Sequence, residues 1–163
     1  MRESPEAAPY GILVRLRDAR RDFHATLTRE AEMRERTFAP AQLLRMLRTQ
    51  VEQISTCASR ERCRSLFVLT VVLYGALDWQ FAGHGIDIEA DVQLERIRQN
   101  QQHGGPEADD RLTAEDWRDR LHKQVMLLER HVANEDEYAA RLVKLTALAQ
   151  AALEAASRQS HGQ

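Results

Sequence analysis

The sequence has few of the residues that turn a chain. It contains seven glycines and four prolines in 163 residues, where average usage would give about 20. A β-sandwich or β-barrel needs a turn signal roughly every 8–12 residues, so the composition excludes those classes and favours a few long helices. Hydrophobic residues make up 43% of the chain. That share is enough to build a core, and it argues against a disordered protein.

Cysteines and long apolar runs are also scarce. Cys57 and Cys63 are six residues apart, which matches neither a C-x-x-C redox pair nor a zinc pair. On a continuous helix they would lie about 9 Å apart along the axis, beyond the roughly 7 Å Cα limit for a disulfide, so we expect free thiols. The N-terminus has no apolar signal-peptide segment, and the longest apolar run, 66–77, is too short for a membrane span. These absences favour a cytoplasmic protein that makes no membrane contact.

Lysine is almost absent, since Lys123 and Lys144 are the only lysines among 23 basic residues. Charge is also uneven, because residues 1–66 hold thirteen arginines against nine acidic residues while the rest of the chain is acidic. Such asymmetry is typical either of a basic face for nucleic acid or of complementary faces within a bundle. Nucleic acid is therefore not excluded as a partner of the Arg-rich half. Asp18 and Asp22 interleave with the arginines of 15–29, which favours ion pairs within one helix.

Apolar residues recur at helical spacing along most of the chain. The spacing predicts helices over about 9–36, 39–59, 60–82, 87–102 and 113–157. The expected fold class is all-α, with one helical-bundle domain of about five helices over 9–157, a loop at 103–112 and disordered tails at 1–8 and 158–163. The run 66–77 is apolar nearly all round, so we place its helix at the centre and the long C-terminal helix outside.

Two helical segments require a choice between alternatives. Residues 86–94 alternate like a strand, but no partner strand exists elsewhere in the chain, so we predict a helix there. An unbroken helix over 113–157, which opens on a capping box at Thr113 and Asp116, would be about 68 Å long, whereas a domain of this size is about 40 Å across. Either the helix breaks near Asn134, which can cap a new helix, or it projects and pairs with a second copy.

One segment has a spacing suited to metal binding. His131 and Glu135 stand at i and i+4, where both side chains would share a helix face and grip one ion. Glu135 also falls on the apolar stripe of its helix, so we expect it to point inward. The segment resembles the last helix of hemerythrin-like domains, with H-x3-E at His131/Glu135 and H-x4-D at His131/Asp136. The resemblance implies a metal-binding bundle, although 39–82 contains no histidine to complete the ligand set. The alternative is that Glu135 pairs with Arg130, His131 or an arginine from another helix.

A second segment, Arg98-Gln-Asn-Gln-Gln-His103, is similar to the R-x4-6-H motif of HEPN ribonucleases, which are also small helical bundles. The resemblance implies that Arg98 and His103 converge on the scissile phosphate of RNA at a dimer interface. Arg17 and His24 fit the same spacing. His103 precedes a Gly-Gly-Pro loop, which gives it no fixed geometry.

Other catalytic signatures are absent from the sequence, which has no Gly-rich phosphate loop, no G-x-S-x-G elbow and no Cys/His zinc cluster. The sequence therefore predicts a non-catalytic protein without a cofactor. It would act through helix faces as a scaffold or regulator, either as a homodimer or as a subunit of a larger complex. The heptad-like faces of 44–58 and 121–149 support this prediction. The alternatives are the metal-binding bundle and an RNA-cleaving or nucleic-acid-associated subunit.

Overall fold

The computed structural model describes residues 7–28, 38–82 and 84–161. Within these residues the chain is all-α, as predicted, and no helix is long and apolar enough to cross a membrane. The helices are α1 (Ala7–Thr28), α3 (Pro40–Gln53), α4 (Ser59–Gln80), α5 (Ile88–His103), α6 (Gly105–Asp109), α7 (Ala114–Arg130) and α8 (Glu135–His161).

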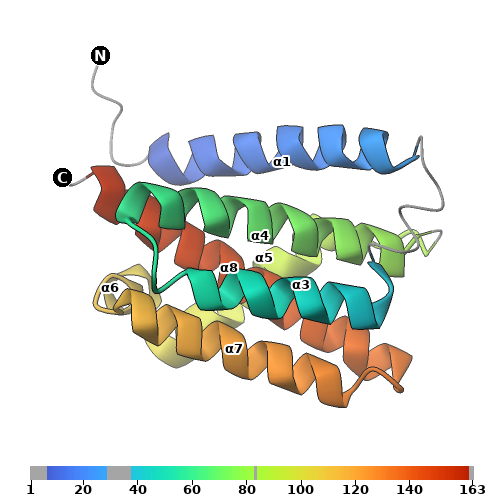
Figure 1. Cartoon of the computed structure of the whole chain (residues 1–163). Coiled ribbons are helices and arrows are strands. Elements are labelled where there is room, and N and C mark those ends of the chain that lie inside the picture. The colour runs from blue at the N-terminus through green and yellow to red at the C-terminus, as the bar shows by residue number, and fades with distance from the viewer. Residues whose placement is uncertain (1–6, 29–37, 83, 162–163) are drawn as a thin grey trace.

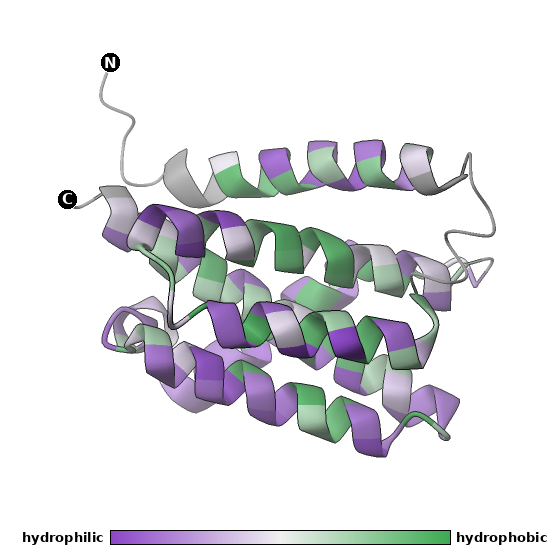
Figure 2. Cartoon of the chain, viewed as in Figure 1, coloured by the Kyte–Doolittle hydropathy of each residue, from purple (hydrophilic) through white to green (hydrophobic). Residues whose placement is uncertain are grey.

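Helices α4 and α8 form the centre of the bundle and pack against each other more extensively than any other pair. Helix α8 also packs on α5 and α7, while α3 contacts both α7 and α4. Helix α1 lies over α4 on the outside of the bundle (Figure 1). The middle of α4 is hydrophobic over consecutive residues, whereas α7 alternates hydrophobic and hydrophilic positions (Figure 2). This difference fits a central helix with neighbours on several sides and an outer helix with one buried face.

The stretch 145–157 of α8 is buried on every side, since each of its residues except Leu148 is buried. It owes this position to small side chains, since Ala147, Ala149, Ala152 and Ala155 are all fully buried. Alanines let neighbouring helices approach closely and keep high helix propensity. The expectation that the whole C-terminal segment lies outside is therefore wrong for its second half. The central place of 60–82 is confirmed.

The long C-terminal segment is broken, as one of the two alternatives predicted. Helix α7 ends at Arg130 and α8 begins at Glu135. The side chain of Asn134 accepts a hydrogen bond from the backbone N–H of Glu137 at 3.1 Å, which satisfies a donor at the start of α8. The chain then folds back so that α8 packs along α7 (Figure 1). A single helix over 113–157 is therefore excluded.

Most other boundaries agree with the sequence to within four residues, but the helix predicted over 39–59 ends at Gln53, six residues early. The segment 88–103 forms a helix, as predicted, and not a strand. The side chain of Asp87 caps this helix by accepting a hydrogen bond from the backbone N–H of Ala90. The expected loop after it contains the short α6, reached through Gly104 at a φ of +94°, a conformation that favours glycine. Helix α8 continues to His161, past the tail expected from residue 158, and Arg158 forms an ion pair with Asp110. Of the tail expected over 1–8, Ala7 and Ala8 already belong to α1 and residues 1–6 lie outside the described residues, as does the end of the first helix, 29–36.

The heptad-like faces of 44–58 and 121–149 pack in the core of the chain's own bundle. Leu47, Val51 and Ile54 are fully buried in one continuous core cluster that also includes Leu121 and Leu128. Helix α3 packs against α7 through these faces. The two faces on which the sequence prediction of a partner rested are therefore already covered by neighbouring helices of the same chain.

Candidate functional site

A cleft of about 380 Å³ opens where α5, α6, α7 and α8 meet. We call it the cationic cleft. Its charged lining consists of Arg96 and Arg98 from α5, Arg120 and Lys123 from α7, Arg141 and Lys144 from α8, and the acidic residues Glu95 and Asp109. Residues three apart lie on the same face of a helix. For this reason α7 and α8 each present a pair of cations to the cleft.

Most of the cations in the cleft form no direct ion pair, although the charge of Arg120 also acts on Asp109 and Asp116. Arg98 pairs with Glu95, and Arg96 pairs with Glu154. The other four side chains form no ion pair or hydrogen bond with the described residues; they are Arg120, Lys123, Arg141 and Lys144. Neighbouring unpaired charges of one sign create a positive potential that attracts anions. The cleft concentrates positive charge in a chain whose net charge is −2.

Some of the residues that line the cleft also hold buried polar atoms that make no hydrogen bond. Seven such side-chain atoms occur among the described residues, and three of them belong to residues of the cleft: Nη1 of Arg96, Oε1 of Gln99 and Oε1 of Gln124. Nearly all buried polar groups in proteins have a partner, and an unpartnered one costs about 1–3 kcal/mol. The three atoms are covered by neighbouring protein atoms, so their unmet hydrogen bonds are a cost to stability at the wall of the cleft.

Asp109, at the end of α6, places a carboxyl group in the same cleft and is 8% exposed. Burial raises the pKa of Asp109 above its ordinary value, while the positive charges of Arg96, Arg158 and Arg120 act in the opposite direction. Burial therefore penalises the ionised form of Asp109 relative to a carboxyl in water, and the three arginines offset part of that penalty.

Arg96 is fixed by a polar chain that runs through the core. Its guanidinium is 11% exposed and pairs with Glu154 on α8. Gln150 donates from Nε2 to Oε1 of Glu154 at 3.3 Å, and the Tyr74 hydroxyl on α4 donates to Oε1 of Gln150 at 2.6 Å. Burial raises the pKa of Tyr74. These contacts leave Nη2 of Arg96 engaged with Glu154, whereas Nη1 is buried without a hydrogen-bond partner.

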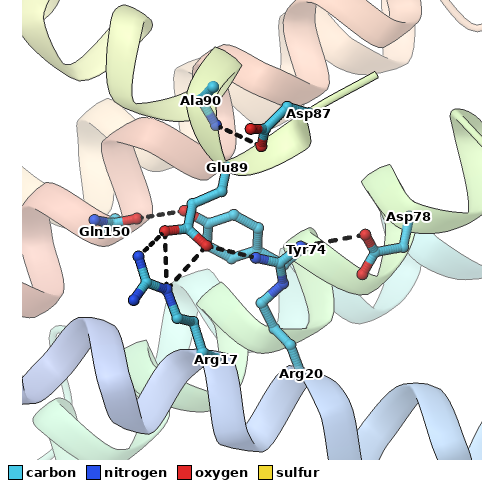
Figure 3. Close-up of polar contacts among 8 residues, drawn as sticks. All are labelled: Arg17, Arg20, Tyr74, Asp78, Asp87, Glu89, Ala90 and Gln150. Atoms are coloured by element: carbon cyan, nitrogen blue, oxygen red, sulfur yellow. Dashed lines mark hydrogen bonds and ion pairs between the residues drawn. The ribbon is translucent and has the colours of Figure 1, made fainter. Parts of the chain in front are cut away.

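The same chain of contacts reaches α1. The guanidinium of Arg20 lies 4.2 Å from the centre of the Tyr74 ring, and it also pairs with Asp78 at 3.2 Å. Arg17 donates from Nε to Glu89 on α5 at 2.9 Å (Figure 3). Of the ion pairs predicted within this helix, Arg21–Asp18 is present at 3.5 Å. Arg17 and Arg20 instead hold α1 against α4 and α5, which is a correction to the expected lattice.

The metal candidates lie on two different helices. His131 follows the last residue of α7 and Glu135 is the first residue of α8, so the break between them removes the shared face that the i, i+4 spacing requires. Glu135 is exposed, which contradicts its expected inward orientation, and it accepts a hydrogen bond from Nε2 of Gln80 at 3.5 Å. Among the described residues, no group of three or more His, Cys, Asp or Glu side chains could hold a metal ion. Cys57 and Cys63 are free thiols, as expected.

The residues similar to the HEPN motif do meet at one place. Arg98 and His103 both line the cationic cleft, near the C-terminal end of α5. Arg98 donates from Nε to Glu95 at 2.9 Å, and this contact directs its guanidinium toward its own helix. Arg17 and His24, which share the spacing, lie on α1, away from the cleft.

The cleft was not predicted, although one signal in the sequence pointed to it. Both lysines of the chain, Lys123 and Lys144, line this single site. Each stands three residues after an arginine, at Arg120 and Arg141, so the pattern R-x-x-K occurs twice. Recognising the site would have required knowing that the two helices pack with these faces toward each other.

No family model, curated protein or solved structure is detectably similar to this chain. The functional proposal below therefore rests on the residues of the cationic cleft.

Proposed function

We propose that the protein is a non-catalytic binding protein whose cationic cleft holds a ligand that carries phosphate or carboxylate groups. The observation that carries the proposal is the convergence of four unpaired cations, two from α7 and two from α8, on one cleft. Neighbouring cations repel one another, and an anion bound between them attracts each of them, which offsets the repulsion. Arginine suits this role because its planar guanidinium binds phosphate and carboxylate through two parallel hydrogen bonds.

The lining of the cleft favours binding over turnover. Among its described side chains there is no serine, threonine, cysteine or tyrosine to act as a nucleophile. His103 is the one histidine among the lining residues, and it is exposed at the end of α5. Every lining residue except Asp109 of the short α6 lies on one of the longer helices α5, α7 and α8. A lining built on helices suits a preformed binding site.

The test is calorimetric titration with inorganic tripolyphosphate. We expect one binding site per chain and an affinity that falls steeply with salt, as charge-based binding requires. The double variant Arg120→Gln/Lys144→Gln should lose at least tenfold in affinity, because each charge-assisted contact contributes about 1.5–3 kcal/mol. Arg45→Gln/Arg130→Gln is the matched control, since both arginines are exposed and lie outside the cleft.

Two results would count against the proposal. One is a wild-type chain that does not bind tripolyphosphate, and the other is an equal loss in both double variants. A third assay, incubation with single-stranded RNA, separates binding from chemistry. Cleavage that is lost in Arg98→Ala would assign the cleft a catalytic role and overturn the non-catalytic proposal.

Self-association is a second candidate function, favoured by the outer face of α5. Leu94 and Ile97 are three residues apart on one face and remain 65% and 54% exposed. A large exposed apolar pair on a helix is typical of a contact surface. Sedimentation of the wild type and of Leu94→Gln/Ile97→Gln tests it, because a homodimer through α5 should dissociate in the variant. A wild-type monomer would remove this candidate.

A further inference from the structure

We propose that the chain has a second binding site, which takes an aliphatic chain with one anionic head group, of the kind that a fatty acid or an alkyl phosphate carries. The site is a pocket of about 420 Å³ between α1, α4 and α8, and we call it the amphipathic pocket. It lies where the first halves of α1 and α4 pass the end of α8 (Figure 1). It shares no lining residue with the cationic cleft.

Three arginines give the amphipathic pocket its positive charge. Arg60 and Arg64 stand one turn apart on α4, and Arg15 reaches the pocket from α1. All three are exposed, and they form no ion pair or hydrogen bond with the described residues. No acidic side chain is among the described residues that line the pocket, so the lining attracts an anion. Guanidinium groups bind carboxylate and phosphate alike through paired hydrogen bonds.

The rest of the wall is mostly apolar. Ile12, Cys63, Phe67 and Leu153 line the pocket from the three helices. Ile12 and Leu153 belong to the buried core, whereas Phe67 is half-buried and packs against that core. Burial raises the pKa of the Cys63 thiol, although the positive charge of Arg15 acts in the opposite direction, so the thiol is neutral near pH 7. A ligand that covered these side chains would remove apolar surface from water, which is favourable.

Polar and apolar side chains follow each other along the helix axes. Arg60 and Arg64 occupy the first turns of α4, and Phe67 follows on the same face, about 10 Å beyond Arg60. Helix α8 runs in the opposite direction to α4 (Figure 1), and its lining residues Ser160 and Leu153 repeat the order from polar to apolar. A molecule that is anionic at one end and aliphatic over about two helical turns matches this order. A compact inorganic anion would leave the apolar wall uncovered.

Calorimetric titration with octanoate, octyl phosphate and octan-1-ol tests the site, because the three probes share one chain and differ in the head group. The tighter of the two anions identifies the head group, and it should bind at least tenfold more tightly than octan-1-ol, since charge-assisted hydrogen bonds are strong. The four-carbon homologue of that anion should bind at least tenfold more weakly, because each methylene that leaves water for an apolar wall strengthens binding about fourfold.

Substitutions assign the head group to the arginines. Arg60→Gln/Arg64→Gln should lower the affinity for the tighter anion at least fivefold, because two charge-assisted contacts are lost. The affinity for octan-1-ol should stay the same. Arg45→Gln/Arg130→Gln is the matched control, since both arginines are exposed and lie outside the pocket, and it should bind all probes as the wild type does.

Alkylation of the two cysteines locates the bound probe. Cys63 lines the pocket and Cys57 does not, and both are free, half-buried thiols. A saturating concentration of the tighter anion should slow the reaction of Cys63 with N-ethylmaleimide at least fivefold, because the bound chain covers the thiol. The rate at Cys57 should not change.

The outcomes are decisive for this site alone. Equal affinity for octan-1-ol and both anions, or for the eight-carbon and four-carbon anions, overturns the proposal. An affinity that is unchanged in Arg60→Gln/Arg64→Gln also overturns it, as does a bound anion that leaves Cys63 unprotected. None of these results bears on the cationic cleft, because its lining residues and its probe, tripolyphosphate, are different.

Discussion

The hydroxyl of Tyr74 on α4 donates a 2.6 Å hydrogen bond to Oε1 of Gln150 on α8, in the interior between the two central helices. Both side chains are fully or almost fully buried. The contact begins a polar chain that passes through Glu154 to Arg96 at the cationic cleft. The core of the bundle therefore positions a residue of the candidate site.

Removing the Tyr74 hydroxyl should destabilise the fold. In Tyr74→Phe, Oε1 of Gln150 stays buried without a donor, which should lower the free energy of unfolding by about 1–3 kcal/mol. Tyr138→Phe is the matched control, because the Tyr138 hydroxyl is buried and has no hydrogen-bond partner. Urea denaturation should show little change or a small gain for Tyr138→Phe. Equal losses in the two variants would contradict the assigned role of the Tyr74 contact.

The buried ion pair between Arg96 and Glu154 should respond differently to single and double substitution. Arg96→Met leaves the Glu154 carboxylate unpaired in the interior and should cost about 3–5 kcal/mol of stability. Arg96→Met/Glu154→Leu removes both charges and should recover much of that loss. Arg48→Met breaks the exposed pair with Glu129 and should have little effect. A double variant no more stable than Arg96→Met, measured by denaturant unfolding, would rule out an unpaired charge as the cause.

Phe23 of α1 packs directly over Gly75 of α4. An added Cβ at Gly75 would lie 2.7 Å from Cε1 of Phe23 and 3.0 Å from Cζ of Phe38. Gly75→Ala should therefore displace the Phe23 ring and cost about 1–3 kcal/mol. Faster amide hydrogen exchange in α1 than in α8 is the expected readout.

Gly11 provides the control for Gly75 on α1 itself. A Cβ at Gly11 meets nothing within 4 Å, so Gly11→Ala should stabilise the helix by about 0.5–1 kcal/mol through helix propensity alone. If amide hydrogen exchange in α1 were as slow in Gly75→Ala as in the wild type, the packing of Phe23 on Gly75 would not contribute to the stability of α1 in the bundle, which would contradict the prediction.

Asp109 should make stability depend on pH in the direction opposite to most carboxylates. Its folded pKa is raised by burial above the unfolded value, which is about 3.9, so the folded chain holds the proton more tightly. The contribution of Asp109 to stability is then greatest below the unfolded pKa and decreases as pH rises through the folded pKa. Asp109→Asn should be more stable than the wild type at pH 7, with the difference shrinking toward pH 3.5. Thermal midpoints of the two proteins across this pH range test the prediction. A stability difference that grows toward acidic pH would contradict it.

Local features of the fold were predictable because they depend on nearby residues. The capping box at Thr113 is formed as expected, with the Thr113 N–H donating to Oδ2 of Asp116 at 2.8 Å and the Asp116 N–H donating back to the Thr113 hydroxyl at 3.1 Å. These hydrogen bonds hold the pKa of Asp116 below its usual value. The cap at Asn134 was likewise visible in the sequence. Its consequence, a fold-back of α8 onto α7, depends on the packing of the whole bundle.

The cationic cleft was not predictable because its charges are mixed with acids along the chain. Asp119 precedes Arg120, and Glu137 lies one helical turn before Arg141. Counts of charged residues along the sequence therefore showed an acidic balance after residue 66, and only the arginines of residues 1–66 indicated a basic face. Helical periodicity sorts the two signs onto different faces. Which faces then meet is decided by the packing of α7 and α8 on α5, and no local pattern encodes that.

Amine labelling of the two lysines tests anion binding in the cleft most directly. Lys123 and Lys144 are the only lysines in the chain and both line the cleft, so mass spectrometry after acetylation reports on this site, with the amino terminus as internal reference. Tripolyphosphate, compared with sodium chloride at equal ionic strength, should slow acetylation of both lysines at least tenfold. The reference amine should not change, and Arg120→Gln/Arg141→Gln should abolish the protection. Lysines that react at the same rate with and without tripolyphosphate would contradict anion binding in the cleft.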